Sequence, residues 1–419
     1  MKITSLETYV VAVPPPYIGG RYWIFVKLKT ACGIEGVGEV YAASFHPDVM
    51  EKAIGDVYQR YLENHDPHHI ERFFREAYSS GFTQRPDVSM MGIVSGLEMA
   101  CWDIIGKAAN KPVYELIGGK VNERLRSYTY LYPKNEDGSY SHDYEDIEPS
   151  VRCAEKYVKQ GFTAIKFDPA GPYTAYCGHQ LSLELLEQSA TFCRRLREAV
   201  GTKCDLIFGT HGQMTPSAAV RLARYIEPYD PLWFEEPVPP GQSEAMGRVA
   251  QRTSIPVATG ERLTTKYEFF DVLRNNAASI LQMNLGRVGG ILEAKKIASL
   301  AEVYYAQIAP HLYNGPIGAA ASIQLGVASP NFLIQESIMR WEGFHAEILK
   351  KPIAWEDGYI IPSTEPGLGV ELDMDVVKAN MPYTSRRLHL TVSTQPFDVK
   401  AGPSDSWKAR YAEDKEQAQ

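Results

Sequence analysis

The chain has 419 residues and a formal net charge of −8, with 43 lysines and arginines against 51 aspartates and glutamates. This acidic balance excludes the basic surplus or stripe that nucleic-acid-binding proteins normally carry. Hydrophobic residues make up 44% of the chain and charged residues 22%, as in ordinary soluble globular proteins. The length predicts two or three domains, or one large barrel with an appended domain.

The N-terminal residues and the cysteines predict a cytoplasmic location. The first apolar run is short, alternates with polar residues and ends in three prolines, which indicates a strand and not a signal peptide. No window approaches the roughly eighteen uninterrupted apolar residues that a membrane span needs. The six cysteines form no CxxC pair, so we expect reduced thiols.

Residues 1–124 are predicted to form an α+β domain. Three β-rich runs, ITSLETYVVAV, YWIFVKLKT and IEGVGEVYA, are separated by segments rich in proline or glycine, which predicts an antiparallel hairpin or meander. From about Pro47 to Gly119 the apolar residues recur at helical spacing, and Asn110-Lys111-Pro112 ends the long helix of this region.

Residues 125–340 are predicted to form a TIM barrel. Short apolar runs alternate with amphipathic stretches, and strands buried on both faces are what a parallel barrel requires. The eight runs are RSYTYLY, TAIKFD, CDLIFGT, PLWFEEP, IPVATGE, SILQMNL, YAQIAPH and NFLIQES. Residues 341–419 break the repeat. We expect them to complete the N-terminal domain and to end in a polar tail.

Polar residues follow most of these runs, at the end of a barrel where active sites lie. Several are acids on successive strands, and a hard cation such as Mg²⁺ offsets the cost of burying them together. The strand-end residues are Lys166, Asp168, Gly209, His211, Glu235, Glu236, Glu261, Asn284, His311 and Glu336.

The motifs SGLEMACWDIIGKAANKPVYELIGG, FEEPVPP, ATGE, GRVGGILEAKKIA and APHLYNGPIGAAASIQL together resemble the mandelate racemase/muconate lactonizing branch of the enolase superfamily. Within that branch the chain is most similar to acid-sugar dehydratases of the galactonate dehydratase type. The resemblance covers nearly the whole chain except about the last thirty residues. It implies an α/β fold with a (β/α)7β barrel and a capping domain, and Mg²⁺-assisted removal of the proton next to a carboxylate.

The resemblance also implies three acidic Mg²⁺ ligands, on the third, fourth and fifth strands. Glu235 and Glu261 match the second and third of these. The position on the third strand holds Gly209, so one of the three protein ligands is not identified. His211 lies two residues further on, where the dehydratase motif also has a histidine, and is a candidate catalytic acid or substitute ligand.

Two further catalytic positions depart from the family pattern. His311 on the seventh strand is present, but its expected aspartate partner is Asn284, whose amide can orient the imidazole without adding charge. On the second strand the family often has two lysines separated by one residue. Lys166 matches the first of them, and Asp168 stands at the position of the second. Because alternate residues share a face, Lys166 and Asp168 could form an ion pair, in which a lysine is a poor base.

Six candidates are expected to contact the substrate, which are Asp168, Asn284, Tyr173, Glu336, Arg21 and Trp23. Tyr173 lies in the loop after the second strand, and Glu336 matches a family acid near the substrate carboxylate. Arg21 and Trp23 belong to a region that folds over the barrel mouth in this family, where it excludes water and contacts the substrate.

We therefore expect a Mg²⁺-dependent dehydratase. It removes the α-proton of a sugar acid and eliminates the β-hydroxyl to give a 2-keto-3-deoxy acid. The base is a group on the strand-two side or His311, and the acid is His211 or His311. A racemase, epimerase or cycloisomerase, and a catalytically impaired homologue that binds acid sugars, stay open as alternatives. The expected partners are a small carboxylate substrate and further copies of the chain.

Overall fold

The computed structural model describes residues 1–41, 44–136, 138–140, 147–170 and 180–389. Its described residues form two compact units. Unit 1 contains residues 1–127, 260–273 and 281–391, and unit 2 contains residues 128–259 and 274–280. The two compact units are not the predicted domains, whose boundaries at residues 124 and 340 remain a prediction.

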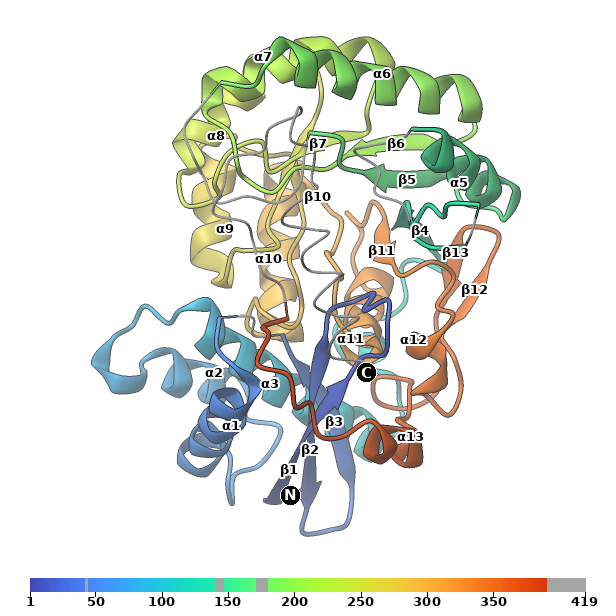
Figure 1. Ribbon diagram of the computed structural model, residues 1–419. Helices are drawn as coiled ribbons and strands as arrows, with labels where there is room; N and C mark the ends of the chain where they lie inside the picture. The colour runs from blue at the N-terminus through green and yellow to red at the C-terminus, as the bar shows by residue number, and fades with distance from the viewer. Residues whose placement is uncertain (42–43, 137, 141–146, 171–179, 390–419) are drawn as a thin grey trace. The chain divides into compact units, whose positions relative to one another are not determined.

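The elements alternate between strands and helices through most of the chain (Figure 1). The strands are β1 (Ile3–Ala12), β2 (Tyr22–Thr30), β3 (Glu35–Val40), β4 (Leu125–Tyr130), β5 (Ala164–Phe167), β6 (Asp205–Phe208), β7 (Trp233–Glu235), β8 (Val257–Thr259), β9 (Ile280–Leu281), β10 (Gln307–Ile308), β11 (Gln335–Ser337), β12 (Ala354–Glu356) and β13 (Tyr359–Ile361). The helices are α1 (Pro47–Tyr61), α2 (Ile70–Tyr78), α3 (Val88–Ala109), α4 (Val113–Leu116), α5 (Ile147–Lys159), α6 (Leu183–Val200), α7 (Pro216–Ile226), α8 (Ser243–Ala250), α9 (Thr265–Arg274), α10 (Ile291–Val303), α11 (Pro316–Val327), α12 (Phe344–Glu347) and α13 (Met374–Ala379), with 3₁₀ turns at Ser80–Phe82 and Glu227–Tyr229.

The N-terminal sheet has the order β1-β2-β3, with both pairs antiparallel, as the sequence predicts. Helix α3 packs against β3 at close range. A Cβ atom added at Gly38 would lie 1.8 Å from the backbone oxygen of Gly96, and one at Gly36 would lie 2.2 Å from that of Ala100. Only glycine therefore allows the strand and the helix to approach so closely.

Helix α3 begins and ends at residues with clear capping chemistry. The Asp87 side chain accepts hydrogen bonds from the backbone N–H groups of Ser89 and Met90, and Asn110 adopts a left-handed conformation at the C-terminus. Among the described residues, α3 is the one helix long and apolar enough to cross a membrane, but 83% of its apolar window is buried inside the protein. Burial in the core accounts for its apolar composition.

The eight predicted barrel strands are β4 to β11, and each of β4 to β10 is followed by a helix, α5 to α11. The sheet order is β10-β9-β8-β7-β6-β5-β4, and β11 pairs with β4. A parallel bridge between Ile308 and Phe332 links the β10 and β11 segments. The described elements therefore confirm the (β/α)7β barrel. Strands β4 and β9 each have residues in both units.

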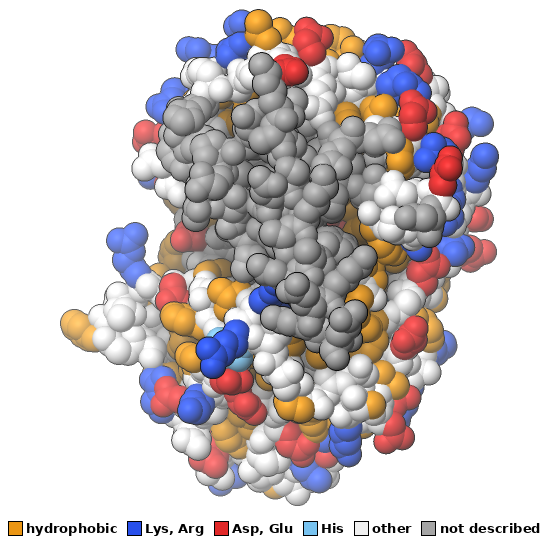
Figure 2. All heavy atoms as spheres, viewed as in Figure 1, with side chains coloured by type: hydrophobic (Ala, Val, Ile, Leu, Met, Phe, Trp, Pro, Cys, Tyr) orange, Lys and Arg blue, Asp and Glu red, His pale blue; other side chains and the backbone are white. Residues whose placement is uncertain are grey.

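The C-terminal segment returns to the N-terminal domain within unit 1. Strand β13 pairs with the start of β4 through Tyr359 and Arg126. The backbone N–H of Ala12 on β1 donates to the carbonyl oxygen of Asn380, just after α13. The polar tail predicted after this segment lies outside the described residues. The view in Figure 2 shows acidic and basic side chains interspersed over the described surface.

Buried acids of the N-terminal domain cap two barrel helices in unit 1. Glu98 on α3 accepts hydrogen bonds from the N–H groups of Ile291 and Leu292 at the start of α10, at 2.8 and 2.9 Å. Glu39 on β3 accepts from the N–H groups of Gly315 and Gly318 at the start of α11. A carboxylate interacts favourably with the positive end of a helix dipole. Burial is the larger effect and raises the pKa of both carboxyl groups to about 7.

We predict that Glu98→Gln destabilises the protein more at pH 5 than at pH 8. The two oxygens of Glu98 each accept a backbone N–H, whereas a glutamine side chain has only one acceptor oxygen. The substitution therefore leaves one buried N–H donor without an acceptor, which costs roughly 1–3 kcal/mol. Because the folded-state pKa of Glu98 is above its ordinary value, the stability that this group contributes is complete at low pH and declines as pH rises toward 7. Urea unfolding at both pH values measures the difference, with the exposed Glu302→Gln as control. A difference that grows with pH contradicts the prediction.

Candidate active site

A buried ion pair joins the second and fourth barrel strands in unit 2. The Lys166 ammonium lies 2.6 Å from Glu235 Oε1, and the two side chains are 1% and 0% exposed. Trp233 Nε1 donates to the other carboxylate oxygen of Glu235 at 3.0 Å, and the Lys166 ammonium lies 4.9 Å from the centre of the Tyr130 ring. Pairing with a carboxylate stabilises the ammonium form of Lys166, which makes it a poor base.

A histidine–carboxylate pair joins the second and third strands of the same unit. His211 Nδ1 lies 3.1 Å from Asp168 Oδ2. The Asp168 side chain is 1% exposed, whereas His211 is 15% exposed. The His211 backbone N–H donates to Gln213 Oε1. Because a carboxylate only accepts hydrogen bonds, Nδ1 carries the proton, and the acceptor lone pair of the neutral imidazole is on Nε2.

Gly209 lies at the end of β6, where the family resemblance places an acid. A Cβ atom at this position would lie 3.0 Å from Tyr130 Oη and 3.3 Å from Lys166 Cε. These contacts are tighter than ordinary van der Waals contacts, so a side chain here requires Tyr130 or Lys166 to shift. The space that an acid at this position would occupy borders the lysine that pairs with Glu235.

A second histidine is held by an amide in unit 1. Asn284 Nδ2 lies 2.9 Å from His311 Nδ1. The orientation of the Asn284 amide follows from its other partners, because Oδ1 accepts from the Gly286 backbone N–H at 2.8 Å and Nδ2 lies 3.2 Å from Asn314 Oδ1. Nδ2 therefore donates to His311 Nδ1. The proton of the neutral imidazole is then on Nε2.

The Nε2 atom of His311 lies 3.1 Å from Glu261 Oε2 in unit 1. Glu261 follows β8, and its backbone oxygen accepts from Arg287 Nη1 at 3.1 Å. The Arg287 guanidinium also lies 3.9 Å from the centre of the Tyr41 ring. Arg287 lies in the GRVGG motif but was not among the predicted site residues. Its contact with Glu261 depends on the fold, which brings the loop after β9 to the end of β8.

The structure places the other candidates as follows. Glu336 is buried and its Oε2 accepts from the Leu312 N–H at 2.8 Å. Trp23 is 1% exposed, donates to the Gly19 carbonyl oxygen and stacks on Phe344. The Arg21 guanidinium lies over the Tyr17 ring. Tyr173 lies outside the described residues. The substrate-binding roles of all four residues remain predictions.

Glu235 ends β7 in unit 2 and Glu261 follows β8 in unit 1, and each carries a carboxylate. The two strands are parallel neighbours, with Glu235 opposite Ala258, and Glu261 follows Ala258 by three residues. Two carboxylates supply the oxygen ligands that hard cations prefer. Gly209 stands where the family resemblance places a third acid, and it has no side chain that could supply a ligand.

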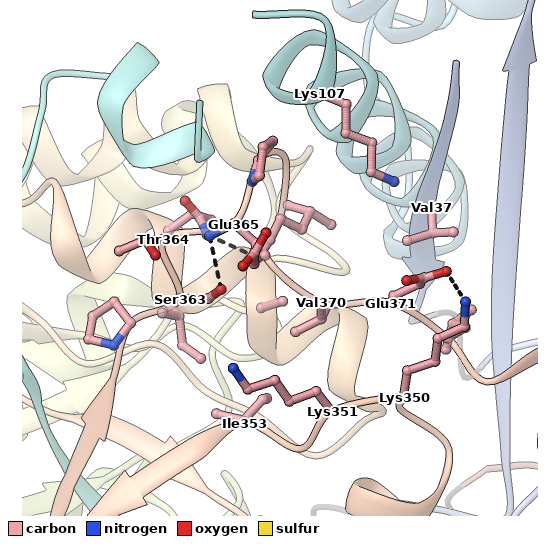
Figure 3. A pocket seen from close by; sticks show the side chains of 18 of the residues that line it. Val37, Lys107, Lys350, Lys351, Ile353, Ser363, Thr364, Glu365, Val370 and Glu371 are labelled. Atoms are coloured by element: carbon pink, nitrogen blue, oxygen red, sulfur yellow. Dashed lines mark hydrogen bonds and ion pairs between the residues drawn. The ribbon is translucent and has the colours of Figure 1, made fainter. Parts of the chain in front are cut away.

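A cleft in unit 1 is lined by none of these strand-end residues. Its volume is about 940 Å³, and its lining includes Val37, Lys107, Lys351 and Ile353. Figure 3 shows Lys350 and Glu371 paired with each other at one side, and the Glu365 backbone N–H bonded to Ser363. We assign the chemistry to the strand ends and not to this cleft.

Comparisons with known proteins identify the family. Residues 150–376 match the enolase C-terminal domain-like family, and residues 15–118 match the N-terminal domain of mandelate racemase/muconate lactonizing enzyme. The chain belongs to the mandelate racemase/muconate lactonizing family of the enolase superfamily. The resemblance inferred from the motifs is therefore confirmed, as is the fold that it implies.

Relatives of the family cover most of this chain. The D-xylonate dehydratase of Haloferax volcanii is 32% identical over 386 residues, which are 91% of this chain and 89% of that protein. The D-galactonate dehydratase of Ralstonia nicotianae is 34% identical over 387 residues, which are 90% and 94%. A mandelate racemase/muconate lactonizing enzyme structure from Sulfitobacter is 54% identical with a TM-score of 0.92, covering 95% of this chain and all of that one (100%).

We predict that Gly209→Asp combined with Tyr130→Phe binds Mg²⁺ more tightly than Gly209→Asp alone. The aspartate adds an anionic oxygen ligand, and removing the Tyr130 hydroxyl removes the nearest atom, 3.0 Å from the new Cβ. Isothermal titration calorimetry measures both affinities, with Tyr130→Phe alone as control. Weaker binding in the folded double variant than in the unsubstituted protein means that Gly209 is needed to leave room at this strand end.

Proposed function

We propose that the protein is an acid-sugar dehydratase that requires a divalent cation. It removes the proton next to the substrate carboxylate and eliminates the β-hydroxyl, which gives a 2-keto-3-deoxy acid. The observation that carries this proposal is the set of residues at or just after the ends of β6, β7, β8 and β10, which are His211, Glu235, Glu261 and His311. Two curated relatives that match about nine tenths of the chain are dehydratases, which are hydro-lyases.

Glu235 and Glu261 would hold the cation, with Mg²⁺ the ion that the family suggests. Among the described residues, His211, Glu235 and Glu261 form a group that could hold a metal ion. The third ligand, beside the two glutamates, would be His211, water or substrate. When bound, the cation supplies positive charge beside the substrate carboxylate, where negative charge develops as the α-proton leaves. The ammonium of Lys166 adds a second fixed positive charge beside Glu235.

The protein residues supply the proton transfers. His211 and His311 are both held by side chains that fix their tautomers, so neither ring needs to reorient during the reaction. The other catalytic candidate, Lys166, is paired with Glu235 and serves this proposal as a positive charge. Glu336 would orient the segment that carries Leu312 next to His311.

We predict that Glu235→Gln and Glu261→Gln each weaken Mg²⁺ binding by about tenfold or more, because each removes a charged oxygen ligand from a hard cation. Calorimetry on the two variants measures this, with Glu244→Gln at the exposed start of α8 as the matched control. Unchanged affinity in both strand-end variants excludes the site.

The reaction is tested by incubating the protein and Mg²⁺ with D-galactonate, D-xylonate and their C2 epimers in D₂O. Proton NMR detects both exchange of the α-proton and formation of a 2-keto-3-deoxy acid. The product is the expected result. Exchange or epimerisation without elimination instead supports a racemase or epimerase, and binding without either reaction supports an impaired sugar-acid-binding homologue.

A further inference from the structure

The segment 311–315, which the structure describes in full, follows β10 in unit 1 and is neither helix nor strand. Its backbone groups are bound by buried side chains from distant parts of the same unit. The Leu312 N–H donates to Glu336, and the Gly315 N–H donates to Glu39. A buried backbone group needs such a partner, so these side chains hold in place a segment that begins with a candidate catalytic histidine.

Two buried histidines bind the two carbonyl oxygens in the middle of this segment. His345 on α12 has its Nε2 atom 2.9 Å from the carbonyl oxygen of Asn314, and His389 after α13 has its Nε2 atom 3.1 Å from that of Tyr313. The two histidines are 3% and 4% exposed. Burial lowers the pKa of both imidazoles to about 4, so both are neutral at pH 7 and can donate one hydrogen bond each.

The same two imidazoles pack against two consecutive glycines of the segment 17–23, which runs into β2. A Cβ atom at Gly19 would lie 2.8 Å from His345 Cε1. One at Gly20 would lie 1.6 Å from His389 Cε1. Both glycines also have positive φ angles, of 87° and 104°, which other residues adopt only at a cost. Each imidazole therefore touches one of these glycines and one carbonyl group of the segment after β10.

Further contacts join the two histidines to the start of β2. The ring centres of His345 and Trp23 lie 4.6 Å apart, and Trp23 Nε1 donates to the carbonyl oxygen of Gly19. His389 Nδ1 lies 3.1 Å from the carbonyl oxygen of Tyr22. Because a neutral imidazole has one N–H, His389 donates to one of its two carbonyl neighbours at a time and packs against the other. Both rings thus contact the two segments at once.

Asn314 connects these histidines to His311. Its carbonyl oxygen binds His345, and its side-chain oxygen lies 3.2 Å from Asn284 Nδ2. The same Asn284 nitrogen lies 2.9 Å from His311 Nδ1. A displacement of the Asn314 backbone therefore moves the amide that orients the His311 ring.

We propose that His345 and His389 are positioning residues that join the segment 17–23 to the segment 311–315 and so fix the place of the His311 ring. The proposal rests on the dehydratase function, in which His311 acts on the substrate. It makes one unit of two segments far apart in sequence, one with predicted substrate contacts and one with a predicted catalytic group. Misplacing a catalytic group by about 1 Å can lower a rate by about 10²-fold, so the two histidines affect the reaction without touching the substrate.

Substitutions that keep or remove the imidazole donor test the proposal. His345→Leu removes the hydrogen bond to Asn314, and we expect it to lower kcat by about 10²-fold with a smaller change in KM. His345→Gln keeps an N–H donor and should recover kcat to within about tenfold, the value of one hydrogen bond. The same pair of substitutions at His389 should have the same effects. The assay uses D-galactonate, D-xylonate and their C2 epimers with saturating Mg²⁺.

Asn331→Leu is the matched control for lost stability. The Asn331 side chain donates to the carbonyl oxygens of Ala298 and Ala306 at 3.0 Å, so its removal also leaves backbone carbonyls unpaired. Ala306 directly precedes β10, at the opposite end of that strand from the segment 311–315. We expect this variant to lose stability to urea as His345→Leu does, with kcat unchanged.

Two measurements test the connection without turnover, on protein free of substrate and Mg²⁺. Hydrogen exchange followed by mass spectrometry should become faster in both segments, 17–23 and 311–315, in His345→Leu and in neither segment in Asn331→Leu. Long-range ¹H–¹⁵N spectra of protein labelled with ¹⁵N-histidine should show displaced His311 signals in His345→Leu and unchanged ones in the control. If a leucine variant does not fold, the same comparisons use His345→Asn, whose amide is too short to replace the Nε2 donor.

The proposal is wrong if hydrogen exchange rises in only one of the two segments, because the histidines then do not join them. It is also wrong if His345→Leu loses stability while kcat and the His311 signals stay unchanged, which leaves this histidine a structural role alone. If no acid sugar reacts with the unsubstituted protein, the dehydratase proposal fails, whereas hydrogen exchange and the spectra still decide whether the two segments are joined.

Discussion

Burying charge at the ends of barrel strands is the constraint on which the candidate site depends. An uncompensated carboxylate in the interior is costly, and the structure gives each of three buried acids a lysine or histidine neighbour. Glu235 meets Lys166, Asp168 meets His211 and Glu261 meets His311. These pairs also hold each side chain in one orientation, so the same interactions that make burial tolerable prepare the groups for chemistry.

The identity of the atom opposite each imidazole then decides what that imidazole can do. Asp168 and Asn284 differ by one functional group, a carboxylate oxygen against an amide nitrogen, and both approach Nδ1 of a histidine within about 3 Å. The first leaves a lone pair at Nε2 and the second leaves a hydrogen there. The family resemblance points to both histidine positions, and the structure distinguishes them by the partner of each Nδ1 atom.

The N-terminal domain follows the same physical rule. Glu39, Glu98 and Asp103 are buried, and each accepts hydrogen bonds from backbone N–H groups distant in sequence. Glu39 and Glu98 cap the barrel helices α11 and α10, and Asp103 bonds the N–H groups of Val37 and Leu368. Within unit 1, buried acids of the N-terminal domain therefore form hydrogen bonds to barrel segments. Burial disfavours the charged form of Glu39 and Glu98 and raises the pKa of both to about 7.

The sequence by itself determined the strand pattern, the order of strands and helices in the barrel, and the positions of the strand-end residues. Local periodicity and helix-stop signals suffice for these, as the end of α3 at Asn110 shows. Side-chain partners needed the tertiary structure. Alternation along β5 predicted an ion pair between Lys166 and Asp168. In the structure β5 and β6 are parallel neighbours, with Phe167 opposite Phe208, and Asp168 lies next to His211. The direction of the Asn284 amide depends on the Gly286 backbone two residues away. No residue pattern encodes that direction, because it follows from the three-dimensional placement of one N–H group.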